Sequence, residues 1–246
     1  MSEKRTDREN KIYGNSEKSK AVPQCESLSF AAKEAFKRLR TNVLISFQHD
    51  KSCHVIGITS AQPSEGKSTV ALNLAYSIAE LDKKVLLIDA DLRRPSLHIK
   101  TGVVQSPGLS NLLLDINSVS VGMRKYTSSD GTVSLSIIPG GDIPPNPSEL
   151  LNSLRAEKLI KALATSYDYI IIDLPPVGAV TDSVAVSRYT DGMIVVLREN
   201  SCPQNVFREC VDQLRYANAK ILGFVMNGTL EGAGKKYQYN NYYYYR

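Results

Sequence analysis

The chain has 246 residues, 42% of them hydrophobic, which is enough for one large domain with a substantial core. Its formal net charge of +5 comes without a long Lys/Arg block or an aromatic stacking motif, so nucleic acid is not expected as a partner. The four cysteines lack the C-x2-C spacing of a zinc site, and no apolar run is long enough to cross a bilayer, so we expect a cytoplasmic protein.

The first part of the chain divides into an arm and a helix. Residues 1–25 are polar and charged without a hydrophobic period, so we expect a flexible arm. Apolar residues at helical spacing predict a helix over residues 26–47. Glu34, Lys37 and Arg40 recur at i, i+3 and i+6 on one face of this helix. On spacing alone, that face is a solvated surface held by salt bridges.

A strand, a loop and a helix then follow one another. The apolar run over residues 55–59 predicts the strand, and it leads into Ala61-x4-Gly66-Lys67-Ser68. This loop is close to the phosphate-binding P-loop G-x4-GK[ST], although Ala61 stands where the motif has its first glycine. An ordinary loop that happens to contain Gly-Lys-Ser is the weaker interpretation, because a strand precedes the loop and a helical pattern follows it.

Each position of this loop has a physical purpose. Successive backbone N–H groups curl around a phosphate, and Gly66 lets the backbone approach closely. Lys67 places a cation on the β- and γ-phosphates, and Ser68 offers its hydroxyl to Mg²⁺. We therefore expect ATP and Mg²⁺ to bind here, with the nucleotide held by Ser64, Glu65, Gly66, Lys67, Ser68 and Thr69.

Two further apolar strands end in carboxylates. The strand over residues 85–89 ends at Asp89, with Asp91 two residues later, and the strand over residues 169–173 ends at Asp173. The carboxyl ends of parallel strands line the ligand crevice of an open α/β sheet. We therefore expect the three aspartates to converge near Lys67, although each one alone is typical of an ordinary strand end.

Strands and helices alternate along the rest of the chain. This alternation predicts a P-loop α/β fold with three α/β/α layers and a mostly parallel sheet, in a domain over residues 26–227. Ser148 is a good N-cap for a helix that continues to residue 163, and residues 93–133 give a poor pattern. The other expected elements are helices at 68–80, 108–114, 182–187 and after Pro203, and strands at 133–138, 193–197 and 221–226.

The stretch from residue 228 to 246 combines glycines with a tyrosine cluster. No helical or strand period explains this cluster, so we expect a flexible tail. Tyrosines in such a tail can enter an active site and accept phosphate, whereas the plainer alternative is a sticky low-complexity segment. The candidate phosphate acceptors are Tyr237, Tyr239, Tyr242, Tyr243, Tyr244 and Tyr245.

Taken together, these motifs resemble a known family. The P-loop and the stretches over residues 88–95 and 170–176 resemble the Walker A, A′ and B motifs of bacterial tyrosine kinases. Residues 144–151, Pro-Pro-Asn-Pro-Ser-Glu-Leu-Leu, resemble a further signature of that family, and the family also ends in a tyrosine cluster. The resemblance covers residues 26–246, and it is greatest to the stand-alone cytoplasmic kinases of capsular and exopolysaccharide synthesis in Gram-positive bacteria.

The resemblance implies an ATP-dependent protein-tyrosine autokinase that phosphorylates its own tail. For this activity we expect Ser68 to ligate Mg²⁺, with Asp91 and Asp173 supporting the ion directly or through water. We expect Asp89 to accept the phenolic proton, with Asp91 as the open alternative. In related P-loop ATPases, an asparagine at the position of Asn227 contacts the adenine base. Arg93 and Arg94 either add positive charge near the phosphates or belong to a solvated turn.

The resemblance also implies partners. In the family, the helix face that carries Glu34, Lys37 and Arg40 links subunits into a ring, although Lys37 stands here in place of an arginine. A transmembrane activator, which regulates polysaccharide chain length, recruits such a kinase to the inner face of the cell membrane and completes its ATP site. A cognate tyrosine phosphatase is a further expected partner.

Two other functions remain open from sequence. A partitioning or cell-division ATPase has the same fold and three motifs, but it usually carries a second lysine early in the P-loop, where this chain has Ala61-Gln62-Pro63-Ser64. Such an ATPase also lacks the terminal tyrosines. A regulatory nucleotide-binding module without kinase activity is disfavoured, because Lys67 and the three aspartates are all present.

Overall fold

A computed structural model describes residues 25–47, 51–114 and 122–228. Its centre is a seven-stranded sheet in the order β3-β4-β2-β5-β1-β6-β7. All neighbouring strands in this sheet pair in parallel except β3, which pairs antiparallel with β4 at one edge. The strands are β1 (His54–Ser60), β2 (Val85–Asp89), β3 (Arg124–Thr127), β4 (Ser134–Ile138), β5 (Tyr169–Asp173), β6 (Gly192–Arg198) and β7 (Ile221–Asn227).

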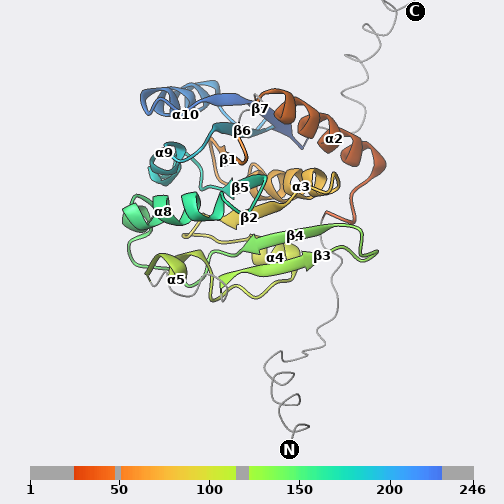
Figure 1. Cartoon of the computed structure of the whole chain (residues 1–246). Coiled ribbons are helices and arrows are strands. Elements are labelled where there is room, and N and C mark those ends of the chain that lie inside the picture. The colour runs from red at the N-terminus through yellow and green to blue at the C-terminus, as the bar shows by residue number, and fades with distance from the viewer. Residues whose placement is uncertain (1–24, 48–50, 115–121, 229–246) are drawn as a thin grey trace, which may run out of the picture.

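Helices cover both faces of the sheet, so the molecule has three layers (Figure 1). Two helices on one side are α2 (Phe30–Ile45) and α3 (Lys67–Ala79), and α4 (Leu97–Thr101) packs against α3. The helices along the other side are α5 (Leu109–Leu114), α7 (Pro147–Leu151), α8 (Leu154–Leu163), α9 (Asp182–Ser187) and α10 (Gln204–Tyr216). The predicted fold class, a three-layer α/β arrangement with a mostly parallel sheet, is confirmed.

The two helical layers have separate apolar cores because side chains alternate along each strand. In β5, Ile170 and Ile172 join the cluster under α8 and α10, whereas Ile171 joins the cluster under α3. These three side chains are at most 1% exposed. A strand that is buried on both faces reads as a continuous apolar run, which is why β1, β2 and β5 were recognisable from sequence.

This packing brings the functional motifs together at the carboxyl ends of the central parallel strands. The strands β2 and β5 are parallel neighbours, and Asp89 is the register partner of Asp173. On the other side of β5, Ile58 of β1 is also in register with Asp173, so the loop after β1 leaves the sheet beside both carboxylates. The expected convergence therefore follows directly from the strand order.

Two expectations about the elements were wrong or incomplete. The single helix expected to run from a cap at Ser148 to residue 163 is two helices, α7 and α8. Ser153 is the N-cap of α8, because its hydroxyl accepts the N–H of Ala156 at 3.2 Å. Within the poorly patterned stretch, the structure has α4 and the antiparallel edge strand β3, which the sequence did not reveal.

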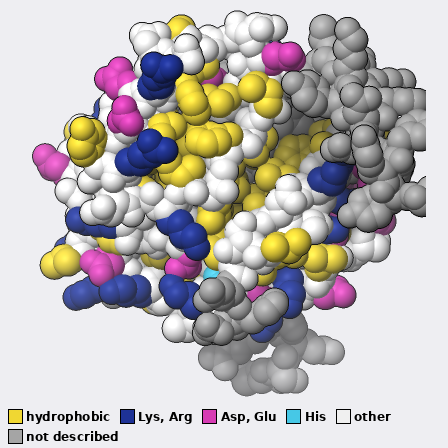
Figure 2. Space-filling view, turned by 90° about the horizontal axis from the view of Figure 1, so that it is seen from above, with side chains coloured by type: hydrophobic (Ala, Val, Ile, Leu, Met, Phe, Trp, Pro, Cys, Tyr) yellow, Lys and Arg dark blue, Asp and Glu magenta, His cyan; other side chains and the backbone are white. Residues whose placement is uncertain are grey.

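The outer strand β7 has exposed apolar side chains: Phe224 is 51% exposed and Met226 is 56% exposed. The view onto α10, β7 and α2 shows hydrophobic side chains gathered in the middle of this face (Figure 2). Within the described ranges, no helix has the length and apolar character that a membrane crossing requires.

Candidate active site

The P-loop joins β1 to α3 and has a special backbone conformation. Both Ser64 (φ 66°) and Gly66 (φ 94°) adopt left-handed conformations, which curve the loop. A glycine is required at position 66 for a second reason. A Cβ atom there would lie 1.9 Å from the side-chain nitrogen of Asn227, so a larger residue would displace the Asn227 side chain from the Glu65 carbonyl.

Glu65 and Asn227 brace this loop from within the protein. The Glu65 side chain is fully buried, and its carboxylate accepts the backbone N–H of Gln62 at 2.8 Å and that of Arg198 at 3.4 Å. Asn227 donates from its amide to the Glu65 carbonyl at 2.9 Å. Both residues were predicted to bind nucleotide, and the structure gives their side chains contacts with the loop backbone.

Lys67 lies between two carboxylates. Its Nζ is 2.8 Å from Asp91 Oδ2 and 3.4 Å from Asp173 Oδ1, and 3.3 Å from Ser68 Oγ. Burial opposes the charge on Lys67, but Asp173 and Asp91 outweigh this effect, so the pKa of the ammonium is raised. Lys67 is therefore a buried cation whose position is fixed by the ends of two strands.

Asp89 has a different environment. It is fully buried, and its Oδ2 accepts the backbone N–H groups of Ser96 and Leu97, both at 2.9 Å. Its Oδ1 accepts the N–H of Asp91 at 3.3 Å. Burial and the nearby carboxylate of Asp173 raise the pKa of Asp89 to about 7. Asp89 thus holds the backbone that leads into α4.

The donors near Lys67 fit a magnesium ion. Asp173 is fully buried, and among the described residues its Oδ2 is a buried atom without a hydrogen-bond partner. Burial raises the pKa of Asp173. The described part of the chain has no ready-made cluster of three or more His, Cys, Asp or Glu metal ligands. Mg²⁺ usually takes one or two carboxylates together with substrate phosphates, so Ser68 and Asp173 suit it.

A pocket of about 600 Å³ opens above these residues, which is within the usual size of a small-molecule site. Its lining includes residues from the P-loop, from the stretch after β2 and from Pro175 to Val180 after β5. Among the described residues that line it are Ser64, Gly66, Lys67, Ser68, Thr69 and Asp91, all of which were expected at the site.

In the described part of the chain, three further cations line the same pocket: Arg93, Arg94 and Lys100. Arg93 is tied down, because its Nε lies 3.0 Å from Oδ2 of the buried Asp182 and its Nη2 donates to Ser148 Oγ at 2.9 Å. This contact joins the pocket to the Pro-Pro-Asn-Pro-Ser segment. Lys100 was not foreseen, and no local pattern marks it, since its place depends on how α4 packs.

The comparisons with known proteins decide the family. A family model described as an AAA domain matches residues 53–203. The tyrosine-protein kinase YwqD of Bacillus subtilis is 35% identical to this chain, over 84% of this chain and 85% of the relative. The chain belongs to the bacterial tyrosine kinase family.

Two more similarities support this bacterial tyrosine kinase assignment. The tyrosine-protein kinase CpsD of Streptococcus agalactiae is 32% identical, over 85% of this chain and 89% of the relative. The solved kinase domain of the Escherichia coli tyrosine kinase ETK superposes with a TM-score of 0.75 at 33% identity, and the match covers 80% of this chain and 76% of that chain.

In this bacterial tyrosine kinase, the structure describes the expected oligomer contacts on α2 but not the expected phosphate acceptors. On α2, Lys37 pairs with Glu34 at 2.8 Å, whereas Arg40 binds the Ser77 carbonyl of α3 and, at 3.3 Å, the C-cap residue Glu80. The expected acceptors among residues 237–245 lie outside the described residues.

Proposed function

We propose that this chain is an ATP- and Mg²⁺-dependent protein-tyrosine kinase that phosphorylates its own C-terminal tyrosine cluster. One observation carries the proposal. In a chain that is 35% identical to a named tyrosine kinase, Lys67 is held 2.8 Å from Asp91 and 3.4 Å from Asp173 at a pocket of nucleotide size. Phosphoryl transfer needs this kind of positioning and charge neutralisation more than it needs covalent chemistry.

The P-loop and its neighbours bind and orient ATP in this proposal. The backbone N–H groups of the loop hold the phosphate chain, and Lys67 neutralises charge on the β- and γ-phosphates. Ser68 and Asp173 would hold Mg²⁺, with support from Asp91, and the ion would neutralise further charge there. Glu65 and Asn227 act on the loop by bracing its backbone.

Asp91 is the better-placed proton acceptor. In the transfer, the phenolic oxygen of tyrosine forms a bond to the γ-phosphorus while the bond to ADP breaks, and the phenolic proton passes to a carboxylate. Asp91 lines the pocket and is 5% exposed, whereas Asp89 is fully buried and accepts three backbone N–H groups. A phenol in the pocket can approach the former and not the latter.

The proposed setting is capsular or exopolysaccharide synthesis at the inner face of the cell membrane. A transmembrane activator would recruit the kinase, subunits would form a ring through Glu34, Lys37 and Arg40, and a tyrosine phosphatase would reverse the reaction. The Glu34–Lys37 pair is exposed on the surface, so a neighbouring subunit can reach both side chains. These partners rest on family membership.

One experiment tests the function. The full chain is incubated with labelled ATP and Mg²⁺, with and without a candidate activator segment, and labelled peptides are mapped. We expect phosphotyrosine among residues 237–245, and its loss in Lys67→Met, while Lys83→Met, at an exposed lysine, behaves as the parent. Release of inorganic phosphate without stable phosphotyrosine in the presence of the activator would favour a partitioning-type ATPase instead.

A further inference from the structure

The nucleotide pocket has a second lysine that approaches from another element. Lys100 lies in the last turn of α4, and its Nζ donates to Thr69 Oγ1 at 3.1 Å. Thr69 follows Ser68 in the first turn of α3, and both threonine and lysine line the pocket. Lys100 therefore reaches the start of the helix at which the P-loop ends.

The position of α4 is fixed by Asp89, the last residue of β2. Asp89, at the end of β2, accepts the N–H groups of Ser96 and Leu97, which are the N-cap and first residue of α4. Leu97 is fully buried in the core beneath α3. One turn of helix separates this anchor from Lys100, so the contacts of Asp89 and Leu97 determine where the Lys100 ammonium lies.

The two lysines make different contacts at the pocket. Lys67 already faces two carboxylates at 2.8 and 3.4 Å, so much of its charge is neutralised within the protein. The hydrogen bond of Lys100 to Thr69 is to a neutral hydroxyl. Burial and the nearby Lys67 lower the pKa of Lys100, and Asp173 opposes the shift, so an anion in the pocket would stabilise this ammonium.

We propose that Lys100 is a phosphate-binding residue that contacts the phosphate chain of the bound nucleotide from the α4 side. This inference rests on the proposed function, because it assumes that the pocket holds Mg·ATP. Partitioning ATPases supply a second lysine from the P-loop itself, and this chain has Ala61-Gln62-Pro63-Ser64 there. In this chain, the second cation, Lys100, comes from α4 instead of the P-loop.

The test compares nucleotide affinities of the full chain and its Lys100→Gln variant. Loss of one charge-assisted phosphate contact should weaken Mg·ATP and Mg·ADP binding about 10- to 100-fold, and should leave adenosine, which has no phosphate, bound as before. The affinity of Lys100→Gln for Mg·ATP should also depend less on salt concentration than that of the parent. Lys100→Arg keeps the charge and should recover most of the affinity.

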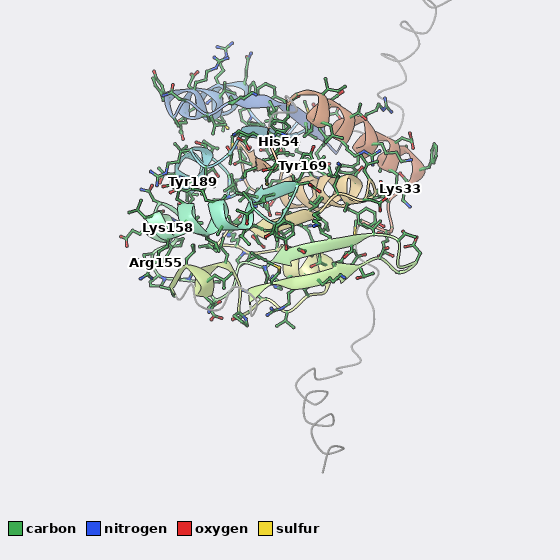
Figure 3. The ribbon with its side chains drawn as sticks, viewed as in Figure 1. Lys33, His54, Arg155, Lys158, Tyr169 and Tyr189 are labelled. Carbon is green, nitrogen blue, oxygen red and sulfur yellow. The ribbon has the colours of Figure 1, made fainter. Side chains whose placement is uncertain are left out.

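The control for this test is an exposed lysine far from the pocket, and three results would contradict the proposal. Lys158→Gln removes an exposed lysine from α8, in the opposite helical layer, and should bind every ligand as the parent does (Figure 3). Unchanged Mg·ATP and Mg·ADP binding by Lys100→Gln, with binding lost in Lys67→Met, would overturn the role of Lys100 alone. An equal loss of adenosine and nucleotide affinity would also overturn it, since that pattern indicates a structural prop. A parent chain that binds no nucleotide would overturn the proposed function itself.

Discussion

At the scale of single residues, the three aspartates of the motifs have three different positions. Asp91 borders the pocket, Asp173 is buried beneath it, and Asp89 is turned toward the backbone before α4. Their spacing in sequence predicted that they converge, because strand ends meet at one edge of the sheet. It did not predict which oxygen atoms are used by backbone N–H groups, since that depends on a helix that the sequence pattern did not reveal.

The pKa of Asp89 leads to a prediction about pH. The folded-state pKa is about 7, above the unfolded value near 4, so between these values the native state holds a proton that the unfolded chain has lost. The free energy of unfolding contributed by Asp89 therefore decreases as pH rises from about 4 to about 7. Asp89→Asn has no such titration, so the parent should lose stability relative to this variant across that window.

Denaturant unfolding at several pH values measures this difference. Asp212→Asn, at an exposed site on α10, is the control and should follow the parent at every pH. A stability difference between the parent and Asp89→Asn that stays constant from pH 4 to pH 7 would contradict the raised pKa.

At the scale of elements, the break between α7 and α8 shows where sequence patterns mislead. Apolar spacing continues across residues 148–163, so one helix was expected. Ser153 interrupts it, because its hydroxyl caps α8 through Ala156 and donates back to the Leu150 carbonyl. The break leaves Ser148 on the short helix α7, where it donates to Asp182 at 2.5 Å.

The cap of α8 can be tested directly. Ser153→Ala removes the hydroxyl that satisfies the first turn of the helix, and it should lower the free energy of unfolding by about 1 kcal/mol. Ser166→Ala, at an exposed position after the same helix, should change it by less than about 0.5 kcal/mol. Chemical denaturation checks both values, and equal effects of the two substitutions would argue against the cap.

Substitutions on α2 can distinguish residues needed for oligomer formation from residues needed for stability. Arg40 ties α2 to α3 through Glu80 and the Ser77 carbonyl, whereas Glu34 and Lys37 contact each other on the surface. We expect Glu34→Ala with Lys37→Ala to reduce the size of any oligomer in light scattering without lowering the melting temperature. Arg40→Ala should lower the melting temperature as well, because it loosens the packing of two helices.

A monomeric parent at high protein concentration, with its tyrosines unphosphorylated, would remove the ring hypothesis.

The predicted elements that were confirmed have a clear apolar pattern, such as α3 and β5. The elements that were missed, α4 and β3, are five and four residues long. These two elements have no continuous apolar run, and they are fixed by tertiary contacts such as that of Lys100 in α4 with Thr69, 31 residues away.

At the scale of the whole molecule, the site and the expected acceptors belong to distant parts of one chain. The P-loop begins just after Ser60, and the tyrosines begin at Tyr237. Deleting residues 237–246 should remove most self-labelling and leave nucleotide affinity unchanged, because the described nucleotide pocket is built from residues before position 228. Phosphopeptide mapping and nucleotide titration measure the two effects.

Mixing variants tests whether transfer occurs between molecules. A chain that lacks residues 237–246 retains the pocket, and a Lys67→Met chain retains the tyrosines. Transfer between subunits predicts phosphotyrosine on the Lys67→Met chain when the two are mixed, and none when either is incubated alone. Labelling that stays absent in the mixture, although the parent labels itself, would indicate transfer within one chain.

The brace between Asn227 and the P-loop has a consequence for biosynthesis. The amide of Asn227 holds the Glu65 carbonyl across 162 residues of sequence, and Gly66 fits against the same side chain. A ribosome therefore makes the phosphate-binding loop long before the strand that supports it. A nascent chain, or one that stalls before β7, carries the whole Gly66-Lys67-Ser68 motif in a loop without its support, so we expect nucleotide binding to arise late in translation.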